Sequence, residues 1–357
     1  MSTEVHLLKA ELLDGEAGFD SAIDALWDSA GLSPCFHKND LVAIKLHVGE
    51  PGVPTAVQPR LAAAIVRCVA RCGAQPFLTD TAVLYRSRRD TGPGHAQVAH
   101  ERGFTPSAVG APFVPADGLI GADEVEVPVQ GKHFTTVAVA AAIAQARSML
   151  VLSHATGHLG TGLAAALKNL GMGCASRKAK LRQHHGQHPR IDPIRCTACG
   201  ECAAWCPSDA IAVAEAAQID TQRCLGCGEC IAVCREGAVT FDWSIRGQEL
   251  QERVVEHAAG VVCDKAGRIA YVTAATGITK DCDCLGLAQE PLVPDIGLLA
   301  SLDPVAIDAA VLDLVAHRAG HSLEALSYPH HDAQVQLRHA EAMGLGTTRY
   351  RLIDVAV

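Results

Sequence analysis

The sequence predicts an α/β body with a mostly parallel sheet, interrupted by a short cysteine-rich α+β module. Along most of the chain, buried-strand patterns alternate with amphipathic-helix patterns, which is typical of helices that cover both faces of a parallel sheet. Eight of the 15 cysteines fall within residues 194–239, where this alternation stops. With 357 residues, 49% of them hydrophobic, the chain can bury more core than one small domain needs.

The elements of the body follow from apolar periodicity and turn residues. In the first part we expect strands at 41–50, 76–84 and 125–130, helices at 58–73, 95–104 and 135–148, and a strand that begins at 148. After the cysteine-rich region, the stretches 252–263, 268–276 and 296–317 resume the alternation, and Asp303 is predicted to cap a helix. The predicted organisation is therefore a body in two parts, residues 1–188 and 246–357, with a module at 189–245.

The module at residues 189–245, here named the cysteine segment, contains one motif twice. The spacing C-x2-C-x2-C-x3-C runs from Cys196 to Cys206 and again from Cys224 to Cys234. Bacterial two-cluster ferredoxins have this spacing, with three thiolates of one loop on one [4Fe-4S] cluster and the fourth on the other. Zinc sites usually pair two C-x2-C units across a longer gap. The predicted ligands are Cys196, Cys199, Cys202 and Cys234 for one cluster, and Cys224, Cys227, Cys230 and Cys206 for the second.

The residues between these cysteines favour the same two cofactors. Gly200, Gly226 and Gly228 allow the backbone to fold closely around a cluster. Short strands are expected at 210–213 and 238–241, each after a fourth cysteine, so the segment is an internal repeat. Because an oxidised cluster with four thiolates carries a charge of about −2, we expect a redox partner protein with a basic docking surface.

Charge and hydropathy narrow the functional class. Lys and Arg total 30 against 39 Asp and Glu, a net charge of −9, which gives no global reason to bind nucleic acid or a membrane surface. We expect a cytoplasmic protein, because we find neither a secretory signal nor an apolar run of roughly 18 to 20 residues. The basic stretch at 176–190 is expected to be a solvated face. The oligomeric state is left open.

Three stretches of the body resemble a family of uncharacterised iron-sulfur-centre proteins, a domain-of-unknown-function group with an inserted ferredoxin module. They are SHATGHLGTGLAAALKNLGMGCASR (153–177), KDCDCLG (280–286) and PDIGLLASLDPVAIDAA (294–310). The resemblance implies a redox or electron-transfer role and gives no substrate.

A second site is predicted around Cys282 and Cys284. In KDCDCLG, an extended backbone would project both thiols to one side and the aspartates to the other. Together with Cys174, His154 and His158, they would supply soft sulfur and nitrogen ligands for one further metal ion or cluster. We expect these residues to meet above the carboxyl ends of the parallel strands, where α/β proteins place their sites. The alternative, that the histidines are ordinary loop residues, stays open.

Other polar residues are candidates for anion binding or proton transfer. The glycine-rich turn at 157–162 precedes a helix expected to begin near Leu163, whose amino terminus would attract an anion, with Lys168 and Asn169 completing the pocket. The alternative, which we prefer, is that the glycines only form a tight strand-to-helix turn. His47 and Glu50 lie at the end of a strand and are candidates for a general acid or base, although capping and turn formation explain them equally well. A solvated linker is expected for three further histidines, His184, His185 and His188.

Three functions follow from these observations. The first is a one-electron carrier in which two [4Fe-4S] clusters pass electrons between a partner and the α/β body. The second is a ferredoxin-coupled reductase with a further metal or anion site in the body. The third is a redox sensor or binding protein in which the clusters stabilise the segment.

Overall fold

The computed structural model describes residues 3–13, 18–184, 188–226, 228–241 and 247–357. An eight-stranded sheet forms its centre, in the order β16-β1-β15-β14-β7-β2-β3-β4. Five neighbouring strands run parallel, namely β14 (Ile269–Ala275), β7 (Ser148–His154), β2 (Leu41–Lys45), β3 (Gln75–Asp80) and β4 (Phe113–Pro115). The predicted mostly parallel sheet is confirmed.

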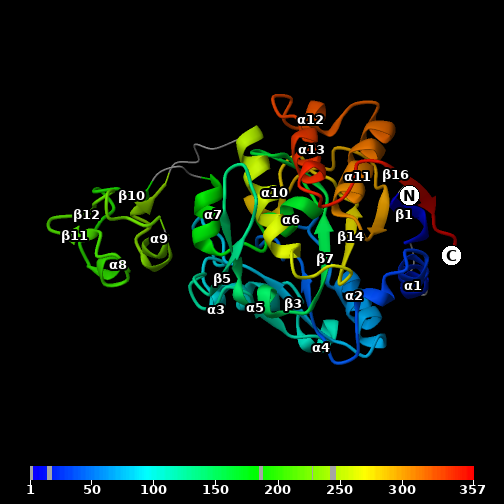
Figure 1. Cartoon of the computed structure of the whole chain (residues 1–357), viewed down its shortest axis with the longest axis horizontal. Helices are drawn as coiled ribbons and strands as arrows, with labels where there is room; N and C mark the ends of the chain where they lie inside the picture. Colours follow the sequence, from blue (N-terminus) through cyan, green and yellow to red (C-terminus); the bar gives the residue numbers. More distant parts are fainter. Residues whose placement is uncertain (1–2, 14–17, 185–187, 227, 242–246) are drawn as a thin grey trace.

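The other edge of the sheet joins the two ends of the chain. Strand β15 (Gly297–Ser301) lies antiparallel to both β14 and β1 (Thr3–Lys9). Strand β16 (Tyr350–Asp354) runs parallel to β1, which brings the termini close together (Figure 1). The first and last parts of the body therefore belong to one sheet.

Helices cover both faces of the sheet, as predicted. One face packs against α1 (Phe19–Ser29), α2 (Pro59–Arg71) and α3 (Gly92–Glu101). The other packs against α6 (Ala166–Gly171), α10 (Gln248–Val262), α11 (Pro304–Ala319) and α13 (Gln334–Ala342). Within β7, Leu150 and Leu152 join the first core while Met149 and Val151 join the second, because successive strand residues point to opposite faces. Shorter elements are η1 (Ala10–Leu12), η2 (Ser33–Cys35), α4 (Pro106–Val109) and α12 (Leu323–Leu326).

Several expected elements are confirmed and two are corrected. Helix α2 matches the prediction closely, and the Oδ1 atom of Asp303 accepts the backbone N–H groups of Val305 and Ala306 as the predicted cap. The helix expected at 135–148 is wrong: β6 (Thr136–Ala140) pairs antiparallel with β5 (Glu124–Pro128), and only α5 (Ala141–Gln145) is helical. A neighbouring strand with free hydrogen-bonding groups outweighs the helix propensity of alanine here.

The helix expected near Leu163 is also placed differently. Strands β8 (Thr156–His158) and β9 (Gly162–Ala164) form a hairpin, and α6 begins only at Ala166. The basic stretch at 176–190 is not a solvated face, because α7 (Arg177–His184) buries Arg177, Lys180 and His184. His185 and the predicted module boundary at 245 lie outside the described residues.

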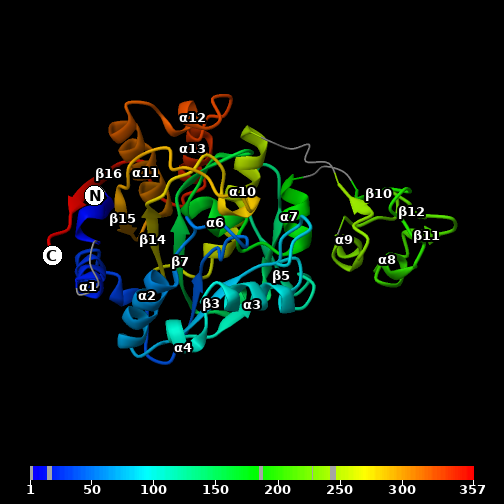
Figure 2. The ribbon, with the colours of Figure 1, turned by 180° about the vertical axis from the view of Figure 1, so that it is seen from behind.

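The cysteine segment has its own short elements: β10 (Arg190–Ile191), α8 (Glu201–Ala204), β11 (Ile211–Val213), β12 (Ala217–Ile219), α9 (Glu229–Val233) and β13 (Val239–Thr240). Both strands expected after a fourth cysteine are present, as β11 and β13. Strand β10 pairs with β13 and β11 pairs with β12, so each pair joins the two halves of the repeat. The segment projects from one end of the body, with α9 nearest to α7 (Figures 1 and 2).

The two halves of the repeat share unusual backbone angles. Ala198 has a φ of 54° and Gly226, at the equivalent position, has 65°. Asp209 and Gly237 form a second such pair, at 48° and 61°. Because positive φ is unfavourable for residues with a Cβ, the first half adopts loops that suit glycine without having glycine at these positions. No helix in the described part of the chain is long and apolar enough to cross a membrane.

Candidate functional site

A cavity of about 710 Å³ lies at the carboxyl ends of β2, β3, β7 and β14. These strands are parallel neighbours, so their last residues meet at one edge of the sheet. The side chains that follow or end them line the cavity, together with residues of the β8–β9 hairpin, α6 and α7. The main polar lining residues are Lys45, His47, Glu50, Asp80, Arg89, His154, Thr156, His158, Lys168, Asn169, Lys180, His184, Cys282, Asp283 and Cys284.

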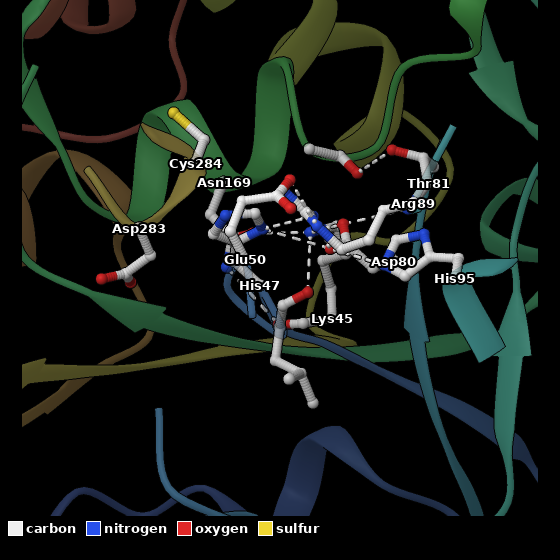
Figure 3. Close-up of polar contacts among 12 residues, drawn as sticks. Lys45, His47, Glu50, Asp80, Thr81, Arg89, His95, Asn169, Asp283 and Cys284 are labelled. Carbon is white, nitrogen blue, oxygen red and sulfur yellow. Dashed lines mark hydrogen bonds and ion pairs between the residues drawn. The ribbon is translucent and has the colours of Figure 1, made fainter. Parts of the chain in front are cut away.

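Asp80 is the centre of a buried charge cluster (Figure 3). Its carboxylate lies 2.8 Å from Lys45 Nζ, 3.2 Å from His47 Nδ1 and 3.6 Å from Arg89 Nη1. Burial alone would raise the pKa of Asp80, but Lys45 and the hydrogen bonds from His47 and His95 hold it well below its usual range. Asp80 is therefore an ionised anchor for the cations around it.

Glu50 is held in a similar way at the rim. Arg89 donates to its Oε1 from Nη2 at 2.7 Å and from Nε at 3.0 Å, and Tyr85 and Ser87 donate to the same carboxylate. Against the effect of burial, Arg89 lowers the pKa of Glu50. These donors come from a distant loop and occupy the carboxylate, so Glu50 serves as the partner of Arg89 and is neither a free general acid or base nor a turn-forming side chain.

His47 and Thr156 present unused polar atoms at the cavity. Burial lowers the pKa of His47 to about 4, so its ring is neutral at pH 7. In the described part of the structure, neither His47 Nε2 nor the buried Thr156 Oγ1 has a hydrogen-bond partner. Buried polar atoms without partners are costly, which favours a bound ligand or water at these two positions.

Two lysines give the cavity an excess of positive charge. Lys180 Nζ donates to Thr81 Oγ1 at 2.5 Å and to the carbonyl oxygens of Ala82 and Ala175. Lys168 Nζ lies 3.6 Å from Cys282 Sγ. Burial lowers the pKa of each lysine to about 8. Among the described residues, no carboxylate forms an ion pair with either ammonium group. Lys180 already uses its three N–H donors, so Lys168 is the lysine suited to an anionic ligand.

Cys282 and Cys284 lie at the cavity, on the same side of their loop, and a disulfide joins them. The loop is not the extended strand that the sequence predicted: η3 (Asp283–Leu285) turns the chain directly after Cys282. Asp283 points the other way, and its carboxylate accepts a hydrogen bond from His154 Nδ1 at 2.8 Å. The backbone N–H of Glu50 donates to the Asp283 carbonyl and fixes the turn.

The structure brings three of the five predicted second-site residues together. Ligand atoms of His158, Cys282 and Cys284 lie within 4.8 Å of one another. His154 is instead held between Asp283 and the Thr276 carbonyl. Cys174 lies in the hydrophobic core, where burial raises the pKa of its thiol to about 12. The structure therefore gathers His158, Cys282 and Cys284 and places His154 and Cys174 apart from them.

The predicted anion site at the amino terminus of a helix is also wrong. The first amides of α6, those of Ala166 and Leu167, donate to the carboxylate of Asp308 at 2.8 and 2.9 Å. Burial raises the pKa of Asp308 to about 7. His184, expected in a solvated linker, lines the cavity, and burial lowers its pKa to about 3. Lys168 and Asn169 line the large cavity from the side of α6 and not from its amino terminus.

In the cysteine segment, residues distant along the chain line one small cavity. Cys234 lies there with Cys196, Cys199 and Cys202. Several sulfurs accept backbone N–H groups, from Ala217 to Cys196 at 3.3 Å, from Ala210 to Cys206 at 3.2 Å, from Gly226 to Cys224 at 3.4 Å and from Ala238 to Cys234 at 3.2 Å. Amides directed at sulfur stabilise thiolates. Cys227, a predicted ligand of the other group, lies outside the described residues.

Two arginines connect the cysteine segment to the body. Arg86 lines the large cavity, and its Nη1 lies 2.5 Å from the place where a Cβ on Gly237 would stand. A Cβ on Gly228 would lie 3.5 Å from Leu181 and 3.6 Å from Arg177, both on α7. Arg177 is 1% exposed, and in the described part of the chain its Nη1 has no acceptor.

Sequence reasoning missed Lys45, Asp80, Arg89 and Lys180. A signal for two of them was present, because Lys45 and Asp80 are charged residues at the ends of otherwise apolar strands. Buried charges of this kind are rare unless they are paired or functional. Arg89 and Lys180 carried no comparable local signal.

Comparisons with known proteins identify the family of this chain. The family described as "Domain of unknown function (DUF362)" matches residues 42–313. Among solved structures, the lactate racemase apoprotein from Thermoanaerobacterium thermosaccharolyticum is similar, with 12% identity and a TM-score of 0.39. That match covers 76% of this chain and 50% of the racemase chain, so this chain spans half the length of that structure. No curated protein matches the chain.

Proposed function

The chain belongs to the DUF362 family, and from this premise we propose that it is a reductase fed by two [4Fe-4S] clusters in the cysteine segment. The cavity of about 710 Å³ carries the proposal. A pure electron carrier needs no cavity lined with lysines and histidines, whereas a reductase needs one for its substrate. The reductase, placed second on sequence grounds, is therefore preferred to the carrier.

The donor set of the cysteine segment fits the two clusters. Cys234 shares a cavity with Cys196, Cys199 and Cys202, which is the arrangement that the crossed ligand assignment requires. Backbone amides already point at four sulfurs of the two groups. When bound, the clusters supply one-electron transfer at low potential.

The contact between segment and body supports electron transfer toward the cavity. Arg86 touches Gly237 of the segment and also lines the cavity. Arg177 lies close enough to Cys230 for an electrostatic interaction with its thiolate. The buried Nη1 atom of Arg177 has no acceptor among the described residues. An arginine N–H of this kind is suited to a sulfur of the second cluster.

The charge of the cavity supports an anionic substrate. The acids of the lining are already engaged, Asp80 with Lys45, Glu50 with Arg89 and Asp283 with His154. Lys168 adds a cationic group with no carboxylate partner in the described part of the protein. Lys180 adds a second positive charge nearby, with its three N–H donors held by Thr81, Ala82 and Ala175. A carboxylate or phosphate group would therefore complete the charge balance, with Thr156 and His47 as further hydrogen-bonding groups.

Anaerobic purification followed by iron and sulfide analysis tests the clusters. We expect about eight irons per chain and EPR signals of two interacting clusters after dithionite reduction. Zinc in place of iron would overturn the proposal.

Reoxidation of the reduced protein by added compounds tests the proposed reductase activity. Small carboxylates and phosphate esters that can accept electrons are added to the reduced protein, and visible absorbance follows the clusters. We expect at least one compound to reoxidise the clusters, and Lys168→Met to slow this about tenfold or more. The control Lys132→Met removes an exposed lysine outside the cavity. If no such compound reoxidises the clusters, the reductase proposal fails and the electron-carrier function is preferred.

A further inference from the structure

We propose that Cys282 and Cys284 form a redox-active dithiol/disulfide pair that lets the cavity perform two-electron chemistry with electrons that arrive singly. This inference rests on the proposed function, since the electrons come from the cysteine segment. Its basis is the disulfide between two residues that line the cavity, with two nitrogen donors beside the sulfurs.

A structural role explains this disulfide poorly. The two cysteines are separated by only two positions, and a cross-link removes less entropy from the unfolded chain as the loop shortens. Hydrogen bonds that do not involve sulfur already hold the loop, from His154 to the Asp283 carboxylate and from the Glu50 amide to the Asp283 carbonyl. The loop can therefore keep its place when the bond is reduced.

The position of the pair suits a reactive disulfide. Both sulfurs line the cavity, with Cys282 buried and Cys284 half-buried. In the described part of the chain, no other two cysteines are joined. Exposure to a cavity separates labile disulfides from inert ones, because a reaction partner must reach the sulfur.

Two donors near the sulfurs favour the reduced state. Lys168 Nζ lies 3.6 Å from Cys282 Sγ, and an ammonium group at this distance stabilises a thiolate. His158 completes the group. Its Nδ1 accepts the backbone N–H groups of Gly160 and Thr161, both at 3.1 Å.

This hydrogen bonding also decides between a redox pair and the predicted metal site. A neutral imidazole whose Nδ1 accepts hydrogen bonds carries its proton on Nε2. Nε2 of His158 then carries the proton and has no lone pair for a metal ion. Metal binding would place a proton on Nδ1, facing two N–H groups.

Reduction and re-formation of the Cys282–Cys284 bond each move two electrons and two protons. The Cys282–Cys284 bond breaks as the pair takes up two electrons and two protons, which gives two thiols. The electrons arrive one at a time from the cysteine segment, where two reduced clusters each lose one, and the protons come from water that enters the cavity. The bond re-forms when an anionic substrate in the cavity accepts two electrons and two protons. The clusters are reduced again by an external one-electron donor protein.

A reductive titration of the anaerobic holoprotein tests the pair. Wild-type protein should take up about four electrons from dithionite, two in the clusters and two in the disulfide, whereas Cys282→Ser and Cys284→Ser should take up about two. The matched control is Cys72→Ser, at the C-terminal cap of α2 and not among the cavity residues; this variant should still take up about four. Cluster EPR signals of unchanged intensity show that each variant is folded.

Thiol labelling gives a readout that does not involve the clusters. Protein equilibrated in dithiothreitol redox buffers is quenched in acid and alkylated, and the peptide containing residues 282 and 284 should gain two labels in one two-electron step. Lys168→Gln should slow alkylation of the reduced pair about tenfold at neutral pH, because the thiolate loses a nearby cation. The matched control is Lys280→Gln, a nearby exposed lysine that lies over Tyr328.

The outcomes separate the two proposals. Missing cluster signals together with a titratable pair would defeat the proposed function and leave the redox pair standing. Intact clusters with only about two electrons taken up by the wild type would defeat the redox pair. So would zinc or extra iron that is lost in Cys282→Ser.

Discussion

The cysteine segment and the α/β body collect their functional residues in different ways. In the segment, every predicted cluster ligand lies between Cys196 and Cys234, and two short copies of one motif supply all eight. In the body, the cavity draws Lys45, Asp80, Lys168 and Cys282 from four separate elements along most of the chain. The segment therefore depends on local spacing, while the body depends on strand order, and the two should respond differently to mutation.

Loss of a ligand in the segment should have the largest effect. Because Cys234→Ala removes a ligand of the first predicted cluster, iron content should fall from about eight to about four per chain. Hydrogen exchange should increase in the segment, since a bound metal supplies folding energy there. Peptides of the sheet should exchange as in the wild type. Metal analysis and hydrogen-exchange mass spectrometry measure both effects, and general loss of protection would contradict the separation of the two regions.

Removal of the central carboxylate should destabilise the body. Asp80→Ala leaves the cations of Lys45 and Arg89 buried with one partner fewer, which costs about 3–5 kcal/mol of unfolding free energy. Urea denaturation of the whole chain measures it. The control Asp332→Ala breaks an exposed pair with Arg338 and should cost less than about 1 kcal/mol. Similar costs for the two variants would argue against an interdependent charge cluster around Asp80.

Acid should destabilise the body through its buried histidines, a cause that the cysteine segment lacks. Burial lowers the pKa of His257 to about 3 and that of His47 to about 4. Below about pH 6.5 these two histidines are protonated in the unfolded chain but stay neutral in the folded protein. The free energy of unfolding therefore falls as the pH drops toward 4, by up to about 1.4 kcal/mol per pH unit for each histidine.

His257→Leu should make this pH dependence shallower. Residues 189–245 contain no histidine, so this cause of acid sensitivity is confined to the body. Denaturation midpoints measured between pH 4 and pH 7 provide the test, and an unchanged slope in the variant would show that His257 is not protonated on unfolding.

The smallest effects compare the two halves of the repeat. Ala198→Gly should stabilise the segment by about 1 kcal/mol, because Ala198 has a φ of 54°. Gly226→Ala should destabilise it by a similar amount. No atom lies within 4 Å of the Cβ that this second change adds, so the cost is that of the backbone alone. Thermal release of the clusters measures both variants, and equal midpoints would mean that the two loops relax.

The sequence alone determined the local features of this protein. Apolar periodicity located most strands and helices, and the repeated cysteine spacing located the short strand after each fourth cysteine, because contacts between near neighbours follow from the geometry of the chain itself. It failed at 135–148, where β6 depends on its partner β5, and at the glycine-rich turn, where the carboxylate of Asp308 occupies the helix terminus.

Only the tertiary structure decided which distant residues meet. The order β14-β7-β2-β3 places Asp80 beside Lys45 and brings Cys282 near His158, and no periodicity in the sequence encodes that order. It also separated Cys174 from the pair and moved Lys180 from an expected solvated face into the cavity. The physical reason is that hydrophobic patterns specify which face of an element is buried, whereas the neighbours of each element depend on packing of the whole sheet.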